Sequence, residues 1–344
     1  MTDFPMHPYP WQLPEWQQLN QQITANKLPH AMLFVGAKGI GKRQLAEALA
    51  QLLLCLTPME GVVCGKCRGC QLNKAHNHPD LIRVEPEEGS KGIKVDQVRS
   101  LIEELSKTSQ QGGYKVVIID PAEGMNANSA NALLKSLEEP AAKTLLILVS
   151  HSASSVLPTI RSRCQLRLLP TPAKEQVALW LTPLMVGTNV ELEKLLEAAG
   201  GSPLTALAYL EGDAMERRNT WLLNLVSLSS GQVSAIEVAG QWHKGDVTAI
   251  VEWLLVMLHA MMRWQVGMPN VLINQLPQEL RDRLARIPPD ILHRYLEKVM
   301  VAKRQLLGSS NPNKQLLLEE MLLDWGAMLR AGNSKKSESH KLKM

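Results

Sequence analysis

The first half of the chain alternates short apolar runs with segments whose apolar residues recur at helical spacing. Five runs have the length of a strand: residues 32–35, 81–84, 116–119, 145–149 and 165–168. The runs at 116–119 and 145–149 are apolar at every position, which is typical of parallel strands covered by helices on both faces. This order of elements predicts an α/β domain with a parallel sheet over residues 1–170. Residues 1–30 are expected to be an irregular lead-in, with Trp11 and Trp16 packed onto this domain.

The second half shows no further strand pattern. Helical spacing over 174–181, 190–199 and 204–210 predicts a small helical domain over residues 171–212. Residues 213–330 are expected to form a second, all-helical domain, broken at Gly231, Gly245, Pro269, Pro288-Pro289 and Gly308–Pro312. Residues 331–344 are polar and contain several lysines, so a disordered tail is expected there.

Composition narrows the class of protein only slightly. The 37 basic and 33 acidic residues among 344 give a formal net charge of +4, which is too mild to imply nucleic-acid binding by itself. Residues 1–22 lack the apolar stretch of a secretory signal. The most apolar window, 248–264, contains charged residues that favour a buried or amphipathic helix over a membrane span. A soluble cytoplasmic protein without membrane contact is therefore expected.

A glycine-rich loop follows the first predicted strand and precedes a predicted helix. Gly36 to Arg43 reads G-x-x-x-x-G-K-R, the pattern of a phosphate-binding loop up to its last position. Gly36, Gly39 and Gly41 let backbone N–H groups approach phosphates at a helix N-terminus, and Lys42 would reach the terminal phosphates. The last position normally carries a hydroxyl that binds Mg²⁺, whereas Arg43 offers no oxygen. The loop is expected to hold a metal ion poorly, and ATP binding without hydrolysis stays open.

A second half of the nucleotide site is predicted at the end of the run 115–119. Asp120 follows this apolar strand and would lie beside the loop, where a carboxylate can hold Mg²⁺. Hydrolysis also needs a group that orients or deprotonates water, and Pro121, which follows, can do neither. Glu123 is a possible substitute base, although its direction from the strand would differ. Hydrolysis by this chain is therefore not expected.

Four of the five cysteines fall within sixteen residues, in a C-x8-C-x2-C-x2-C array: Cys55, Cys64, Cys67 and Cys70. Four thiolates in tetrahedral geometry form a closed structural zinc site. An iron–sulfur or redox site is the alternative, while a disulfide framework is disfavoured in a cytosolic chain. His76 and His78 lie near enough to replace a cysteine, but are expected to be surface residues. A closed site would stabilise the fold rather than perform chemistry.

Two further segments have ordinary interpretations by themselves. Residues 129–140 read as an amphipathic helix ended by Pro140, and Arg161 and Arg163 read as a solvated basic turn before the last strand. Their significance depends on the order in which they stand with the other motifs.

Six segments occur in the order of one known family: Pro29-His30-Ala31, the loop 36–43, the cysteine segment 55–70, His78-Pro79-Asp80, the run 131–140 and Ser162-Arg163-Cys164. By these the chain resembles the bacterial clamp-loader branch of the AAA+ ATPases. The run Ala132-Leu133-Leu134-Lys135 to Glu138-Glu139-Pro140 and the Ser-Arg-Cys tripeptide are highly specific to it. The resemblance covers most of residues 29–165. It implies an AAA+ domain with a zinc module, followed by a helical lid domain and an all-helical collar domain for oligomerisation.

Within this family the chain departs from the gamma/tau motor at three positions. The motor has Gly-Lys-Thr, Asp-Glu and a lid arginine where this chain has Lys42-Arg43, Asp120-Pro121 and Leu204. The chain is therefore similar to a subunit of the loader that does not hydrolyse ATP. The resemblance also implies that Arg163 is an arginine finger, which acts in trans on the nucleotide of a neighbouring subunit.

The resemblance implies a set of partners. They are the gamma/tau and delta subunits in a heteropentameric ring, with the sliding clamp and primer–template DNA reached through the complex, as part of a DNA polymerase holoenzyme. Two other functions stay open: an active ATPase that uses Lys42, Asp120 and Glu123, and a nucleic-acid binder that uses Lys66 and Arg68 of the cysteine segment.

Overall fold

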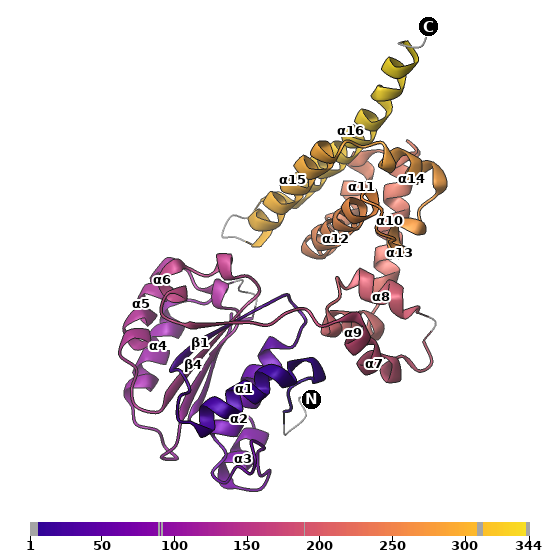
Figure 1. Cartoon of the computed structure of the whole chain (residues 1–344). Coiled ribbons are helices and arrows are strands. Elements are labelled where there is room, and N and C mark those ends of the chain that lie inside the picture. Colours follow the sequence, from indigo (N-terminus) through magenta and orange to yellow (C-terminus); the bar gives the residue numbers. More distant parts are fainter. Residues whose placement is uncertain (1–5, 89, 91, 189, 308–311, 342–344) are drawn as a thin grey trace. The chain divides into compact units, whose positions relative to one another are not determined.

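The computed structural model describes residues 6–88, 90, 92–188, 190–307 and 312–341 of the chain (Figure 1). Its contacts divide the chain into two compact units. The first contains Met1–Leu181 with Ser202–Thr205, and the second contains Thr182–Gly201 with Ala206–Met344. The predicted α/β part falls in the first unit and most of the predicted helical part in the second.

A sheet of five parallel strands forms the centre of the first unit. Its order is β2-β3-β4-β1-β5, with β1 at Ala31–Val35, β2 at Leu81–Val84, β3 at Lys115–Ile119, β4 at Thr144–Ser150 and β5 at Gln165–Leu168. Leu33 is opposite Leu148 of β4 and Leu166 of β5, so β1 lies between these two strands. All five predicted strands are confirmed to within one residue at each end. Three of them, β1, β3 and β4, were recognisable because they are buried at every position.

Alternate residues of the strands face two separate hydrophobic layers. Leu33, Val117 and Leu146 pack with α4 (Val95–Ser106), α5 (Ala127–Glu138) and α6 (Pro158–Arg161). Phe34, Ile118 and Ile147 pack on the opposite face with α1 (Leu13–Thr24) and α2 (Lys42–Leu53). Figure 1 shows these two groups of helices on opposite sides of the sheet. The remaining elements of the unit are η1 (Pro10–Gln12), α3 (Arg68–Lys74), η2 (Ala122–Gly124), η3 (Ala153–Ser155) and α7 (Lys174–Leu181).

The lead-in differs from its prediction. Residues 1–30 were expected to be irregular, but Leu13–Thr24 form the twelve-residue helix α1. Trp16, Leu19 and Ile23 recur at helical spacing and contact the second hydrophobic layer, with Leu19 fully buried. Pro14 lies in the first turn, where proline is compatible with a helix. The expected contact of Trp16 with the domain is confirmed.

Helices make up the second unit. They are η4 (Thr182–Met185), α8 (Leu192–Ala198), most of α9 (Pro203–Glu211), α10 (Ala214–Ser229), α11 (Ala235–Trp242), α12 (Val247–Gln265), α13 (Val271–Asn274), α14 (Gln278–Ala285), α15 (Pro289–Leu307) and α16 (Lys314–Lys341). Breaks occur where glycine and proline predicted them, for example at Gly231 after α10 and Gly245 after α11. The segment 308–311 lies outside the described residues. The predicted boundary between two helical domains at residue 212 stays a prediction.

The chain's end and its most apolar helix need separate comment. α16 is helical through Lys341, whereas residues 331–344 were expected to be disordered; they contain no proline that would end the helix. Residues 342–344 lie outside the described part. Among the described helices, α12 alone is long and apolar enough to cross a membrane. Leu254, Leu258 and Met261 of α12 are fully buried in the core of the second unit, in agreement with the predicted buried helix.

Candidate functional site

The loop between β1 and α2 borders an open cavity of about 240 Å³ in the first unit. Five of the six residues predicted for a nucleotide site line this cavity: Gly39, Gly41, Lys42, Arg43 and Asp120. Gly36 lies behind them, directly after β1. Glycine is required at position 41, because its φ of 87° lies in the left-handed region. A Cβ atom there would also come within 2.5 Å of the Tyr9 ring.

Lys42 is turned back onto its own loop. Its ammonium group donates hydrogen bonds to the carbonyl oxygens of Gly36, at 2.9 Å, and Ala37, at 2.7 Å. The third contact is Nδ1 of His151, at 3.1 Å. An ammonium group has three donors, so these contacts use all of them. Burial lowers the pKa of Lys42 to about 8, although nearby carboxylates oppose the change.

Arg43 stands where a metal-binding hydroxyl is normally found. Its guanidinium donates to both carboxylate oxygens of Glu85, with Nη1 2.9 Å from Oε2. Asp120 lines the same cavity at the end of β3, and burial raises its pKa while the positive charge of Arg43 lowers it. A divalent cation beside Asp120 would therefore also meet the positive charge of the Arg43 guanidinium.

Glu123, the possible substitute base, is not among the residues that line the cavity. Its Oε1 accepts the backbone N–H of His151 at 2.9 Å, and its Oε2 is buried without a hydrogen-bond partner in the described part of the chain. Glu123 therefore positions the segment after β4. The sequence had predicted only that Glu123 would point in a different direction from a residue directly after Asp120.

Residues far away in the sequence close over the loop. The Trp11 indole donates to the Ile40 carbonyl at 2.9 Å, and the Gln12 amide donates to the Gly41 carbonyl at 2.8 Å. The ring of Tyr9 stacks on that of Trp11 with centroids 4.8 Å apart. These contacts confirm that Trp11 packs on the domain, and they add Tyr9 and Gln12 to the site.

The start of α9 holds the loop from another direction. The Ser202 hydroxyl donates to the Lys38 carbonyl at 2.6 Å, and the Leu204 N–H donates to the Gly39 carbonyl at 2.9 Å. Leu204 also lines the cavity.

The four cysteines form one cluster, in which all four sulfurs lie within 4.8 Å of one another. The sulfur of Cys55 lies 3.9 Å from that of Cys67, and the sulfur of Cys64 lies 3.9 Å from that of Cys70. Four ligands about 2.3 Å from a tetrahedral zinc ion are about 3.8 Å apart, so this spacing fits the ion. Hydrogen bonds from the Thr57 side chain and two backbone N–H groups lower the pKa of Cys64 to about 5. The cluster can therefore hold a metal ion.

The two neighbouring histidines do not belong to this cluster. His76 is exposed, as expected, but His78 is only 5% exposed and was wrongly expected at the surface. Its Nδ1 accepts the N–H of Asp80 at 3.1 Å. The Asp80 carboxylate in turn accepts the N–H groups of Gln110 and Gln111, so this polar group braces the loop before β3.

Arg163 lies between α6 and β5 and does not line the cavity around Lys42. Its Nε donates to Oε1 of Glu138, the last residue of α5, at 2.5 Å, and its Nη2 contacts the same oxygen. Its Nη1 donates to the Thr159 carbonyl at 3.0 Å. The Arg163 side chain remains one-third exposed, so it is held in one direction while part of its guanidinium faces solvent.

Comparisons with known proteins agree over most of the chain. Family models for the DNA polymerase III delta subunit and for its C-terminal part match residues 11–173 and 212–327. The chain is 38% identical to the DNA polymerase III subunit delta' of Pseudomonas aeruginosa, over 93% of this chain and 98% of that protein. Its identity to the corresponding Escherichia coli subunit is 33%, over 92% and 94%. The chain belongs to the family of DNA polymerase III delta' subunits.

A tau/gamma subunit is less similar to this chain than the two delta' subunits named above. The DNA polymerase III subunit tau/gamma of Haemophilus influenzae is 27% identical, over 88% of this chain but only 46% of that protein.

Among the residues that sequence reasoning missed in this delta' family member, Tyr9 and His151 line the cavity, and Gln12 donates to the loop behind it. Only His151 had a usable signal, because polar residues that follow a parallel strand lie at the edge where ligands bind. Tyr9 and Gln12 act across about 30 residues of sequence, and no local pattern records such a contact.

Proposed function

We propose that this chain is the delta' subunit of a clamp loader, that it does not hydrolyse ATP, and that it supplies Arg163 to the ATP site of a neighbouring subunit. Its partners are gamma/tau and delta subunits in a heteropentameric ring. Through that ring it helps to load the sliding clamp onto primer–template DNA.

The observation that carries the proposal is the state of Lys42. In a working phosphate loop this ammonium group binds terminal phosphates, but here its three donors are taken by Gly36, Ala37 and His151. Arg43 places its positively charged guanidinium, which pairs with Glu85, where Mg²⁺ would be bound. Together with Pro121 after Asp120, these contacts support a site that lacks the means of hydrolysis.

Arg163 supports the second part of the proposal. It lies away from the chain's own nucleotide site, as a residue that acts in trans must. A guanidinium brought to the γ-phosphate of a neighbour stabilises charge that develops in the transition state. The contact with Glu138 directs the side chain before any neighbour binds, which reduces the entropy lost on docking.

The cysteine cluster takes a structural part in this proposal. Cys55, Cys64, Cys67 and Cys70 would hold one zinc ion, with no coordination position left for a substrate. Such an ion ties the end of α2 to α3, a seven-residue helix that is too short to be stable by itself.

The test is ATP hydrolysis by a loader reconstituted from its subunits, with clamp and primed DNA present. Arg163→Ala is compared with Arg161→Ala, a nearby arginine in the same turn that makes only a long contact with the Ala153 carbonyl. We expect Arg163→Ala to slow hydrolysis sharply while the complex still assembles, and Arg161→Ala to change little. The isolated chain should hydrolyse no ATP. Turnover by the isolated chain that is abolished by Lys42→Ala would overturn the proposal and support an ATPase of gamma/tau type.

A further inference from the structure

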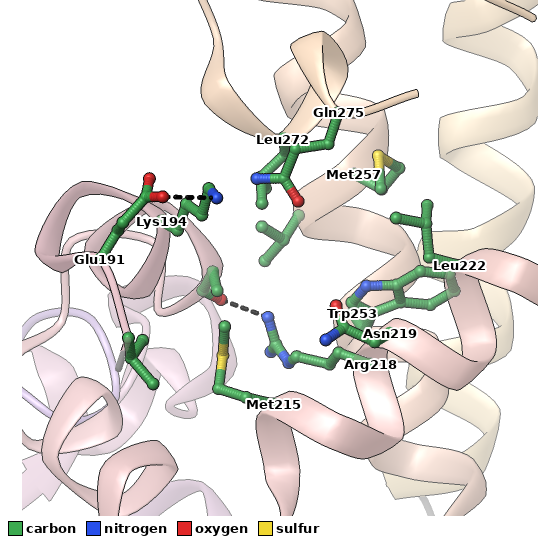
Figure 2. A pocket seen from close by; sticks show the side chains of 13 residues that line it. Glu191, Lys194, Met215, Arg218, Asn219, Leu222, Trp253, Met257, Leu272 and Gln275 are labelled. Carbon is green, nitrogen blue, oxygen red and sulfur yellow. Dashed lines mark hydrogen bonds and ion pairs between the residues drawn. The ribbon is translucent and has the colours of Figure 1, made fainter. Parts of the chain in front are cut away.

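A second cavity lies entirely within the second unit and takes no part in the proposed function. Its volume is about 230 Å³, and its walls come from α8, α10, α12 and α13 with the residues just before α8. Figure 2 shows Glu191 and Lys194 on one side and Leu222, Trp253 and Met257 on the other. Two cationic side chains, Lys194 and Arg218, and a large apolar surface line the same cavity.

The apolar surface is built from the core of the unit. Trp253 and Met257 are 4% and 3% exposed, and Leu222 and Leu272 are half-buried beside them. Methionine adapts its shape to what it contacts, so Met215 and Met257 allow the cavity to accept apolar side chains of different forms.

Arg218 gives the cavity its charge. This residue of α10 is only 8% exposed, yet its partners are neutral. Nη1 donates to the Ala198 carbonyl, Nη2 donates to the Tyr209 hydroxyl, and Cζ lies 4.3 Å from the centre of the Tyr209 ring. Three of the five guanidinium N–H bonds are left over, and in the described part of the chain no carboxylate forms an ion pair with Arg218.

A buried cation without an acidic partner is costly, which makes an external anion favourable here. The acidic groups near Arg218 are already engaged. Glu252 pairs with Lys303 at 3.1 Å, and Glu191 pairs with Lys194 at 2.9 Å on the open side of the cavity. The Glu191–Lys194 pair is partly exposed and therefore weak, so Lys194 can exchange its partner for a ligand carboxylate.

We propose that this cavity binds a segment of a partner protein that presents a large apolar side chain next to an aspartate or glutamate. The apolar side chain lies on Trp253 and Met257, while the carboxylate accepts from Arg218 and Lys194. The positive charge selects an acidic rather than a basic segment.

The test uses the full chain and a set of acetylated, amidated tetrapeptides in which Leu, Met or Phe precedes Asp or Glu. Binding is measured by ligand-observed NMR up to millimolar concentration. Peptides with Asn or Gln in place of the acid are the chemical control, and 3-phenylpropionate tests a free small carboxylate. We expect saturable binding of the acidic peptides and an affinity about tenfold or more lower for the amides.

Arg218→Gln should lower the affinity by a similar factor, and Arg217→Gln is its matched control. Arg217 is the preceding residue of α10, exposed and paired with Asp213, and does not line the cavity. Because Arg218 also joins α10 to α8, Lys194→Glu serves as a second variant at a partly exposed position and should also weaken binding. Equal binding of acids and amides, no binding of any peptide, binding of 3-phenylpropionate alone, or unchanged affinity in Lys194→Glu would each overturn the proposal.

Discussion

Replacement of Glu138 tests whether the direction of Arg163 matters as much as its charge. Glu138 ends α5 and accepts both Nε and Nη2 of Arg163 through one oxygen, Oε1. In Glu138→Ala the guanidinium would keep, among the described residues, the Thr159 carbonyl at 3.0 Å and the more distant Ser162 hydroxyl at 3.3 Å. The variant keeps the charge of Arg163 but removes the group that directs it.

The structure predicts two effects of very different size. The side chains of Arg163 and Glu138 are 33% and 48% exposed, and an ion pair at such exposure stabilises a fold by only about 0.2–1 kcal/mol. Misplacement of a catalytic group by about 1 Å, by contrast, costs about a hundredfold in rate, and loss of an arginine finger costs about a thousandfold or more. We therefore expect Glu138→Ala to slow hydrolysis at the affected site by about tenfold to a hundredfold, with little loss of stability.

The assay is single-turnover ATP hydrolysis by the reconstituted loader, together with thermal unfolding of the isolated chain. Glu139→Ala is the matched control, because Glu139 is exposed and its only hydrogen bond in the described structure is a backbone one to Lys135. Glu138→Gln, which keeps an acceptor without charge, should lie between wild type and Glu138→Ala. If Glu138→Ala hydrolyses ATP at the wild-type rate while Arg163→Ala does not, Glu138 has no positioning role. If neither variant slows the loader, the role of Arg163 is also wrong.

Three further predictions concern metal, pH and packing. Purified chain should contain one zinc ion, and Cys67→Ser should lose it and increase hydrogen exchange over residues 55–75; bound iron would contradict this. Because the pKa of Lys42 falls from 10.5 to about 8 on folding, the unfolded chain binds more protons between these values, so stability rises with pH by at most about 1.4 kcal/mol per unit. The free energy of unfolding, measured with denaturant between pH 8 and 10.5, should rise with pH more steeply in wild type than in Lys42→Met. Equal slopes in the two proteins would refute this prediction. Arg83→Ala leaves the 5%-exposed carboxylate of Glu47 unpaired and should cost about 3–5 kcal/mol, whereas Arg99→Ala at an exposed pair should cost under about 1 kcal/mol; equal losses would contradict the structure.

Strands were predictable here for a simple physical reason. A parallel strand covered on both faces must be apolar at nearly every position, and 116–119 and 145–149 satisfy this without any tertiary information. The helix α1 was missed because Pro8, Pro10 and Pro14 suggested an irregular segment. Its helical character rests on Leu19, whose burial depends on a surface formed by residues far along the chain.

The site was predictable only where its chemistry is local. The residues of the loop and those of the cysteine cluster stand at fixed, short spacings along the chain. The sequence alone therefore places the members of each group close together. The contacts of Arg43 with Glu85 and of Arg163 with Glu138 span 42 and 25 residues. Such pairs depend on strand order, and the order β2-β3-β4-β1-β5 cannot be derived from one sequence.

The contacts of the loop also suggest why a subunit without hydrolysis would keep a phosphate-binding fold. A nucleotide changes the conformation of a protein only if it binds one conformation more tightly than another. Here Lys42 is bonded to Gly36 and Ala37, and the loop carbonyls of Lys38 and Gly39 are bonded to the start of α9. These contacts would, under the proposed function, hold the loop in one conformation with or without nucleotide. Under the proposed function, such a subunit presents Arg163 from a fixed frame while its neighbours change shape around their own ATP.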